Sequence, residues 1–141
     1  MKKHLLLIIM TMMTLVSFAQ SATRTPVFLF GKAVYDEGPV ESDYIQSGTV
    51  SFDPSTYTVT FDNVVIDYPV NNEYAVLSGS SGMNITLRVV GTCNVKSAET
   101  FMRGDKVTIQ GVNYSGRLIV TINANRNRNF ISANSNVTIT E

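Results

Sequence analysis

Short runs of apolar residues, separated by polar turns, fill the chain from Val27 to its last residue. Within the runs, apolar side chains alternate with polar ones, and valine, isoleucine, threonine and aromatic residues predominate. This alternation and composition are typical of β-strands that bury one face. No window keeps apolar residues at the spacing of an α-helix, so the pattern predicts an all-β protein.

Two hairpins are predicted before the middle of the chain. The first spans residues 27–35 and turns at Gly31 and Lys32. The second spans residues 49–61 and turns at Asp53-Pro54-Ser55-Thr56, where proline sets the backbone angle of a type I turn. A polar, acidic loop separates the two hairpins.

A repeated unit begins after the second hairpin. It consists of an apolar pair, a turn rich in Gly, Asn, Ser or Asp, and a short strand in which threonine stands between two aliphatic residues. The central threonines are Thr86, Thr108 and Thr138, with Thr60 in an earlier copy, at spacings of about 26, 22 and 30 residues. Second short strands lie between these copies, at residues 64–66, 93–95 and 118–122.

Three short strands in each repeat of roughly 20 to 30 residues predict a short parallel β-helix of about three coils. One coil cannot bury its inward apolar residues alone, and stacking on the next coil completes both the core and the backbone hydrogen bonds. We expect the β-helix to occupy residues 49–141, with residues 20–48 as an N-terminal cap. Protruding loops are expected at residues 68–74, 112–117 and 123–129.

The last predicted strand, residues 137–141, stands in the middle of a coil. An end without a polar cap exposes apolar residues and an unpaired strand edge, which favours association. Three explanations remain open: the native protein continues, the edge pairs with another chain, or the gene is truncated. We expect a further C-terminal portion.

Residues 1–19 have the pattern of a secretory signal peptide. Two lysines precede an uncharged apolar run of about fourteen residues, shorter than the roughly twenty that a membrane-spanning helix needs. Ser17 and Ala19 are small residues at the positions that signal peptidase reads, so we expect cleavage before Gln20. An uncleaved anchor is the alternative. No later run is comparably apolar, so the mature chain is expected in the periplasm, at the cell surface or outside the cell, with no membrane span.

Cleavage changes which chemistry remains. The mature chain keeps nine basic and eleven acidic residues, and its formal charge of −2 favours neither nucleic acid nor an anionic membrane. It loses His4, the only histidine, which excludes nucleophilic catalysis that relies on imidazole. Cys93 has no second cysteine to pair with, and we expect a buried, inert thiol rather than a reactive or intermolecular one. The sequence therefore predicts a protein without enzymatic activity.

Acidic residues gather in the first half, where no Lys or Arg lies between Lys32 and Arg88. Calcium takes several oxygen ligands, so the acidic loop is the candidate metal site. Its carboxylates are Asp36, Glu37, Glu41 and Asp43. Their spacing does not follow a dense calcium-binding loop, and a solvated acidic face is the alternative. No other cofactor is expected.

Basic residues gather in the second half. Arginines on stacked loops can bind anionic glycans through paired hydrogen bonds, and tyrosine rings can stack on sugars. The candidate ligand residues are Arg103, Arg117, Arg126, Arg128, Tyr68 and Tyr74. The alternative is that the arginines are simply solvated and the tyrosines pack within strands.

Residues 48–66, 85–95 and 107–111 combine Thr-centred strands with Gly, Asp and Asn corners; the first stretch reads Gly-Thr-Val-Ser-Phe-Asp-Pro-Ser-Thr-Tyr-Thr-Val-Thr-Phe-Asp-Asn-Val-Val-Ile. Together they resemble exported, pectate-lyase-like β-helix proteins, the carbohydrate-binding-domain family of gut and cellulolytic bacteria. The end of the predicted signal, Phe-Ala-Gln, is similar to signals of Bacteroidota. The resemblance implies a right-handed parallel β-helix, secretion and, in some members, binding of acidic plant polysaccharide with calcium.

The expected function is therefore a non-catalytic, extracytoplasmic module that binds carbohydrate. One alternative is a structural or adhesive repeat protein that associates through its open end, and another is a degenerate polysaccharide lyase. The expected partner is a glycan, or another protein chain at the C-terminal edge.

Overall fold

The computed structural model describes residues 25–69, 74–97, 100–113, 116–122 and 130–141. The predicted signal peptide and its cleavage site lie outside the described residues. The described chain is built of strands and turns without a helix, and accordingly it holds no helix long and apolar enough to cross a membrane. The all-β prediction is confirmed.

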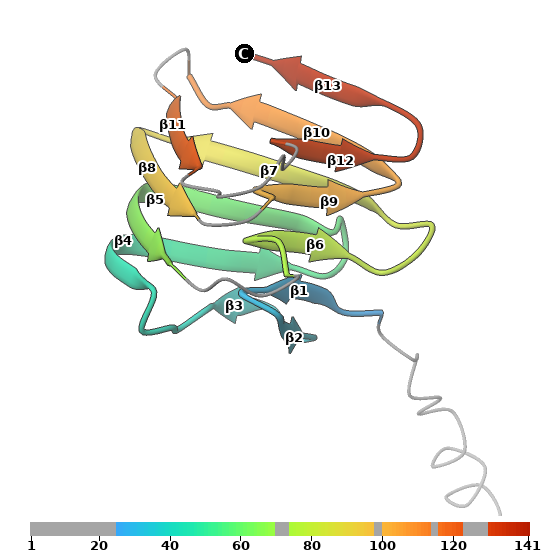
Figure 1. Cartoon of the computed structure of the whole chain (residues 1–141), viewed down its shortest axis with the longest axis horizontal. Coiled ribbons are helices and arrows are strands. Elements are labelled where there is room, and N and C mark those ends of the chain that lie inside the picture. The colour runs from blue at the N-terminus through green and yellow to red at the C-terminus, as the bar shows by residue number, and fades with distance from the viewer. Residues whose placement is uncertain (1–24, 70–73, 98–99, 114–115, 123–129) are drawn as a thin grey trace, which may run out of the picture.

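The strands of the described chain form two hydrogen-bonded sheets (Figure 1). One is ordered β12-β9-β6-β1-β2. The other is ordered β11-β8-β5-β7-β10-β13, and in it β4 also pairs with β5, and β3 pairs with β4. Their bounds are β1 Val27–Leu29, β2 Lys32–Val34, β3 Gly38–Pro39, β4 Ile45–Asp53, β5 Thr58–Tyr68, β6 Leu77–Gly79, β7 Asn84–Val90, β8 Thr92–Ser97, β9 Met102–Gly104, β10 Lys106–Gly111, β11 Arg117–Ile122, β12 Ile131–Ala133 and β13 Val137–Thr140.

The predicted N-terminal hairpin is present as β1 and β2, but its turn lies one residue earlier than expected. Leu29 pairs with Lys32, so Phe30 and Gly31 form the turn, both with positive φ, 54° and 76°. Two successive positive φ values match the twist of a tight hairpin, although they are unusual for phenylalanine. The Phe30 ring is buried against the rings of Tyr44 and Tyr68, and its centroid lies 5.4 Å from each of theirs. This packing offsets the cost of the positive φ.

The second hairpin is confirmed, with β4 and β5 longer than the sequence suggested. Its turn begins at Asp53, whose carboxylate accepts hydrogen bonds from the Ser55 amide at 2.8 Å and from the Thr56 hydroxyl at 2.8 Å. The acidic loop before it contains the short strand β3, which pairs with β4. Because β4 runs from Ile45 to Asp53, it crosses the boundary expected at residue 48.

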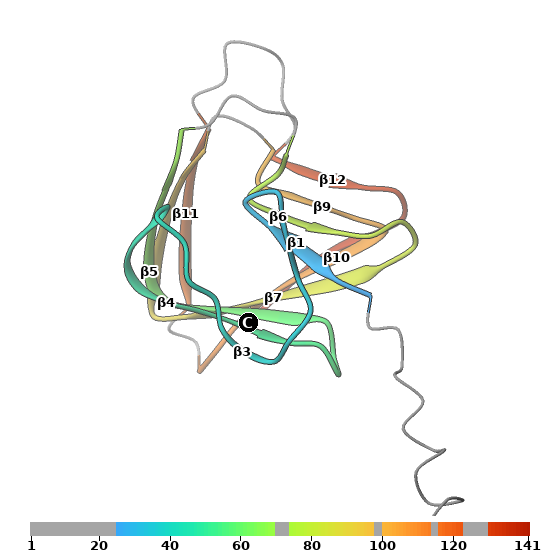
Figure 2. The same ribbon diagram turned by 90° about the horizontal axis from the view of Figure 1, so that it is seen from below.

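Three strand directions repeat along the chain. β5 bends at Asn63, where φ is 46°, so that residues 58–62 pair with β7 and residues 65–68 pair with β8. We call β5 and β6 the first coil, β7, β8 and β9 the second, and β10, β11 and β12 the third. Equivalent strands of successive coils pair in parallel, and the strands lie along three sides when viewed from below (Figure 2).

The register between coils confirms two of the three predicted spacings. Thr86 is opposite Thr108, and Thr108 is opposite Thr138, at the predicted offsets of 22 and 30 residues. The first offset is wrong, because Thr58 rather than Thr60 lies opposite Thr86. A shift of two residues keeps every side chain on its predicted face, since strand side chains alternate with period two.

The core lies between the three faces. One inward column runs through Val59, Leu87, Ile109 and Ile139, which are opposite one another on β5, β7, β10 and β13. The first three are buried, Ile109 being 6% exposed, whereas Ile139 is 71% exposed. The core is therefore closed around the first coils and open beside β13.

Candidate binding groove

The outer face of β5, β7 and β10 presents polar side chains in register. Because Val59, Leu87 and Ile109 point inward, the residues that follow them point outward. These residues are Thr60, Arg88 and Gln110, which lie opposite one another, and Thr140 of β13 continues the row. A parallel row holds the threonines Thr58, Thr86, Thr108 and Thr138.

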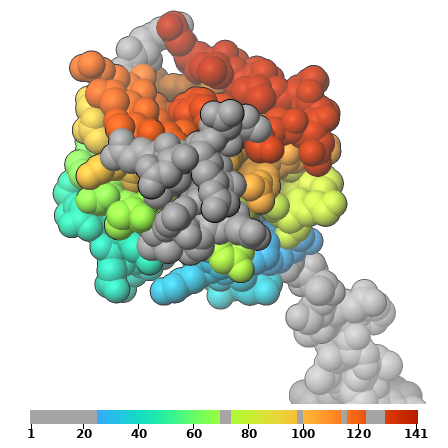
Figure 3. All heavy atoms as spheres, in the orientation of Figure 1, coloured from blue at the N-terminus to red at the C-terminus, as the bar shows by residue number. Residues whose placement is uncertain are grey.

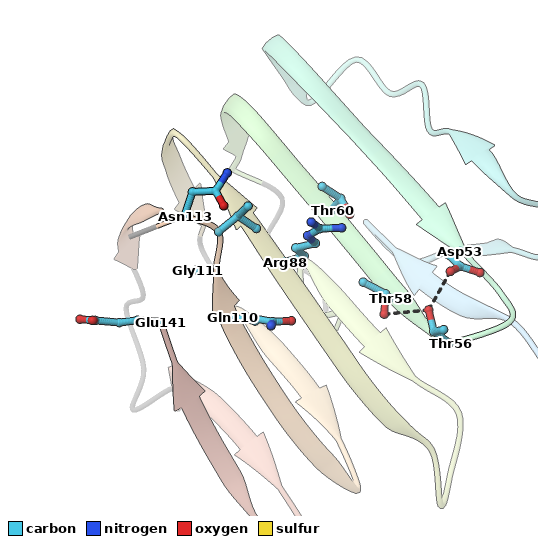
Figure 4. Close-up of a pocket in the computed structure, with 10 residues that line it drawn as sticks. Asp53, Thr56, Thr58, Thr60, Arg88, Gln110, Gly111, Asn113 and Glu141 are labelled. Carbon is cyan, nitrogen blue, oxygen red and sulfur yellow. Dashed lines mark hydrogen bonds between the residues drawn. The ribbon is translucent and has the colours of Figure 1, made fainter. Parts of the chain in front are cut away.

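An open groove of about 700 Å³ lies on this face. Its lining is mostly polar, and consists of Asp53, Thr56, Thr58, Thr60, Arg88, Gln110, Gly111, Val112, Asn113 and Glu141. Asp53 and Thr56 lie at one end, Glu141 and Asn113 lie towards the other, and Arg88 lies between them (Figure 4). The groove therefore crosses the strands rather than following one of them.

Asp53 provides a fixed negative charge at one end of the groove. Hydrogen bonds from the side chain of Ser55, and secondly from that of Thr56, lower the pKa of the Asp53 carboxyl below its ordinary value of 3.8. Thr56 in turn shares a hydrogen bond of 2.9 Å with the Thr58 hydroxyl (Figure 4). This network orients the hydroxyl groups that line this end.

Arg88 provides the positive charge in the middle of the groove. Its side chain is exposed, and Figure 4 draws no hydrogen bond from it to another residue of the groove. A guanidinium group carries five N–H donors, which suit carboxylate and hydroxyl oxygens. With threonine hydroxyls and the Gln110 and Asn113 amides around it, the groove offers both donors and acceptors to a polar ligand.

Of the predicted arginine candidates, the two that the structure describes lie on different faces. Arg103 is exposed on β9, in register with Ser78 and Ser132. Arg117 is exposed at the start of β11, opposite Thr92, and therefore belongs to a different face. Neither residue lines the groove, and Arg126 and Arg128 lie outside the described residues.

Tyr68 is not available to a ligand, which corrects the prediction that it stacks on a sugar. Its side chain is 1% exposed, and its ring packs edge-on against Tyr44 with centroids 4.8 Å apart. Because the ring is buried in the core, a sugar at the surface cannot stack on it. Tyr74 is exposed as expected, but its ring lies beside Gly31, near the first hairpin.

The predicted calcium ligands are also not gathered into a site. Asp36, Glu37, Glu41 and Asp43 are all exposed on the loop around β3. Within the described ranges, no three or more His, Cys, Asp or Glu side chains come close enough together to hold a metal ion. The short β3 ladder stretches the loop along β4, which spreads its carboxylates instead of folding them around one point.

Sequence reasoning missed the residues of the groove, although a signal for them exists. Arg88, Gln110 and Thr140 each stand two residues after a central threonine of the repeat. A period of two places them on the same face as that threonine, so the repeat itself defines a polar row. The sequence predicted the turn at Asp53, but not that this turn lies beside the polar row and closes one end of the groove.

Space-filling atoms of the described residues show the coils as one continuous body in which β13 forms one end (Figure 3).

Comparison of the chain with models of protein families, with curated proteins and with solved structures found no match in any of the three.

Proposed function

We propose that the protein is an exported, non-catalytic module with a right-handed parallel β-helix, and that it binds carbohydrate in the groove across β5, β7 and β10. The observation that carries the proposal is the polar row of Thr60, Arg88 and Gln110, which three successive coils place in register within one groove.

The β-helix is supported by parallel pairing between equivalent strands at all three sides of the molecule. Right-handedness is supported by the general preference of connections between parallel strands. Export is supported by the sequence of residues 1–19 alone.

Carbohydrate as the ligand is supported by the chemistry of the groove. Sugars present many hydroxyl groups, which pair with hydroxyl, amide and guanidinium groups such as those that line it. Neighbouring strands are about 4.8 Å apart, which is similar to the length of one sugar residue in an extended chain. Arg88 additionally favours sugars that carry a carboxylate, because guanidinium and carboxylate form paired, charge-assisted hydrogen bonds.

A glycan array, probed with the exported chain in calcium and in chelator, tests this function. We expect binding to extended polysaccharides, and loss of that binding in the double variant Arg88→Ala, Gln110→Ala. Lys96→Ala is the matched control, since Lys96 is exposed on β8, away from the groove. Binding that Lys96→Ala weakens as strongly as the double variant, or no binding to any glycan, contradicts the proposal. Release of unsaturated sugars would identify a polysaccharide lyase instead.

A further inference from the structure

The carboxylate of Asp53, at one end of the groove, already accepts several hydrogen bonds from its own turn. Ser55 donates its backbone N–H to Oδ1 at 2.8 Å and its hydroxyl to the same oxygen at 2.6 Å. Thr56 donates its hydroxyl to Oδ2 at 2.8 Å. An ionised carboxylate offers about four acceptor positions, so most of those of Asp53 are taken. What Asp53 presents to a ligand is therefore mainly its negative charge, which the lowered pKa of its carboxyl maintains at neutral pH.

The direction of these bonds decides how the Thr58 hydroxyl meets a ligand. A threonine hydroxyl has one hydrogen, and an ionised carboxylate can only accept, so the hydrogen of Thr56 is used on Asp53. The hydroxyl oxygens of Thr56 and Thr58 are 2.9 Å apart, and in that bond Thr58 must be the donor (Figure 4). The hydrogen of Thr58 is therefore directed to Thr56, and its oxygen is left as an acceptor for a ligand in the groove.

Arg88, on the neighbouring strand, has the opposite chemistry. Its guanidinium group donates hydrogen bonds and cannot accept them. Among the described residues that line the groove it is the one cation, while Asp53 and Glu141 are the acids. Thr60 rather than Thr58 is opposite Arg88, so Thr58 and Arg88 lie one strand and two residues apart, roughly 8 Å between Cα atoms. The groove thus changes from acceptor to donor within the length of two sugar residues.

We propose that this end of the groove selects glycans in which an isolated carboxylate stands among neutral sugars, and that it rejects chains with a carboxylate on every residue. The carboxylate binds Arg88, while the neighbouring sugar donates a hydroxyl to Thr58 and lies near Asp53. This selectivity rests on the proposed binding of carbohydrate in the groove, and adds which sugars the groove takes.

The rejection of fully charged chains follows from the groups at the Asp53 end. A carboxylate on the sugar beside Thr58 can only accept hydrogen bonds, and it meets an oxygen that is also an acceptor. It also meets the negative charge of Asp53, and two like charges at this separation repel each other. A neutral sugar at the same place offers hydroxyl hydrogens instead. Asp53 is therefore a specificity-determining residue, although its oxygens are mostly occupied by its own turn.

Calorimetric titration of the exported chain, in chelator, with pentasaccharides that differ only in charge tests this selectivity. One series consists of β-1,4-linked glucose pentamers with no glucuronate, with glucuronate at the centre alone, or with glucuronate at every position. A second series consists of α-1,4-linked galacturonate pentamers that are fully methyl-esterified, free at the centre alone, or fully free. We expect the singly charged pentamer to bind about threefold to tenfold more tightly than the neutral and the fully charged ones.

Two variants separate the roles of the acid and the base. In Asp53→Asn, which keeps a side-chain oxygen for the turn, the ratio between the Kd values of the fully and singly charged pentamers should fall about threefold or more. In Arg88→Gln, the advantage of the singly charged pentamer over the neutral one should disappear. Asp43→Asn is the matched control, because Asp43 is exposed on the loop before β4 and does not line the groove. It changes the net charge as Asp53→Asn does, and should leave the ratio unchanged.

The ratio of affinities distinguishes selectivity from folding, because a poorly folded variant loses all three pentamers together. Fully charged pentamers that bind as tightly as singly charged ones, or equal shifts of the ratio in Asp53→Asn and Asp43→Asn, overturn the selectivity and leave carbohydrate binding intact. Absence of binding in both series overturns the selectivity as well. Only if the glycan array also shows no binding does the proposed function fail with it.

Discussion

The side-chain oxygen of Asn63 accepts a hydrogen bond of 3.2 Å from the backbone N–H of Thr92, and so joins the corner of the first coil to the corner of the second. The Asn63 amide also donates to the Asp62 carboxylate at 2.8 Å. Asn63 adopts a φ of 46°, which asparagine tolerates better than most residues. One residue thus bends β5 between two faces and caps the next corner.

Replacement of this asparagine is expected to destabilise the fold. Asn63→Ala removes the hydrogen bond to Thr92 and places alanine in a left-handed conformation, so the free energy of unfolding falls by about 1–3 kcal/mol. Urea unfolding measures the change. Asn94→Ala, an exposed asparagine within β8, is the control and is expected to change stability by less than about 0.5 kcal/mol. Asn63→Gly, which accepts the backbone angle, recovers part of the loss; no recovery would show that the angle carries no cost.

A pair of glycines separates steric overlap from backbone strain. Gly91 and Gly82 both have positive φ, 63° and 76°. A Cβ at Gly91 overlaps the side-chain amide of Asn63, whereas a Cβ at Gly82 meets nothing within 4 Å. Gly82→Ala is therefore expected to cost about 1–2 kcal/mol from strain, and Gly91→Ala to cost more, by about 1 kcal/mol or more. Thermal or urea unfolding of the two variants compares them, and equal losses contradict the packed corner.

The Asp53 turn predicts a dependence of stability on pH. Because hydrogen bonds lower the pKa of the Asp53 carboxyl in the folded chain, its ionised form stabilises the fold at pH values above its unfolded pKa of about 3.9. This contribution is lost as the pH falls through the folded pKa, which lies below 3.8. The stability difference between the protein and Asp53→Asn is thus expected to be constant near neutral pH and to shrink in acid. A carboxyl titration by NMR with a midpoint at or above 3.8 contradicts this.

Cys93 is expected to react only when the protein unfolds. Its thiol is buried, with Sγ 3.5 Å from the backbone oxygen of Phe61, and burial raises the pKa of the thiol above its ordinary 9.0. Little thiolate therefore exists near neutral pH. A disulfide reagent should modify the native chain far more slowly than the chain in denaturant. Equal rates would show that β5 and β8 do not enclose the side chain.

The repeat made many of the strands predictable. The contacts of Asn63 and Tyr68 show what could not be predicted. The structure reproduces the predicted offsets between the strands of Thr86, Thr108 and Thr138. The sequence predicted these strands because side-chain alternation within a strand shows which face is buried. The sequence did not predict that Asn63 joins two corners, because this depends on its hydrogen bond with Thr92, which is distant in sequence. Tyr68 was expected in a protruding loop, at residues 68–74. Its burial depends on Phe30 and Tyr44, which lie far from it in the sequence.

The sequence by itself determined that the described chain is all-β, which residues of the repeated strands point inward, and that similar strands recur about every 20 to 30 residues. Only the tertiary structure decided that Thr58 rather than Thr60 is opposite Thr86, that Arg88 and Gln110 share a groove with Asp53, and that the acidic loop lies stretched along β4. The physical reason is the distance along the chain between the residues that interact. Side-chain alternation is set by neighbouring residues, whereas register and proximity between coils are set by bends, turn lengths and packing partners that lie tens of residues away.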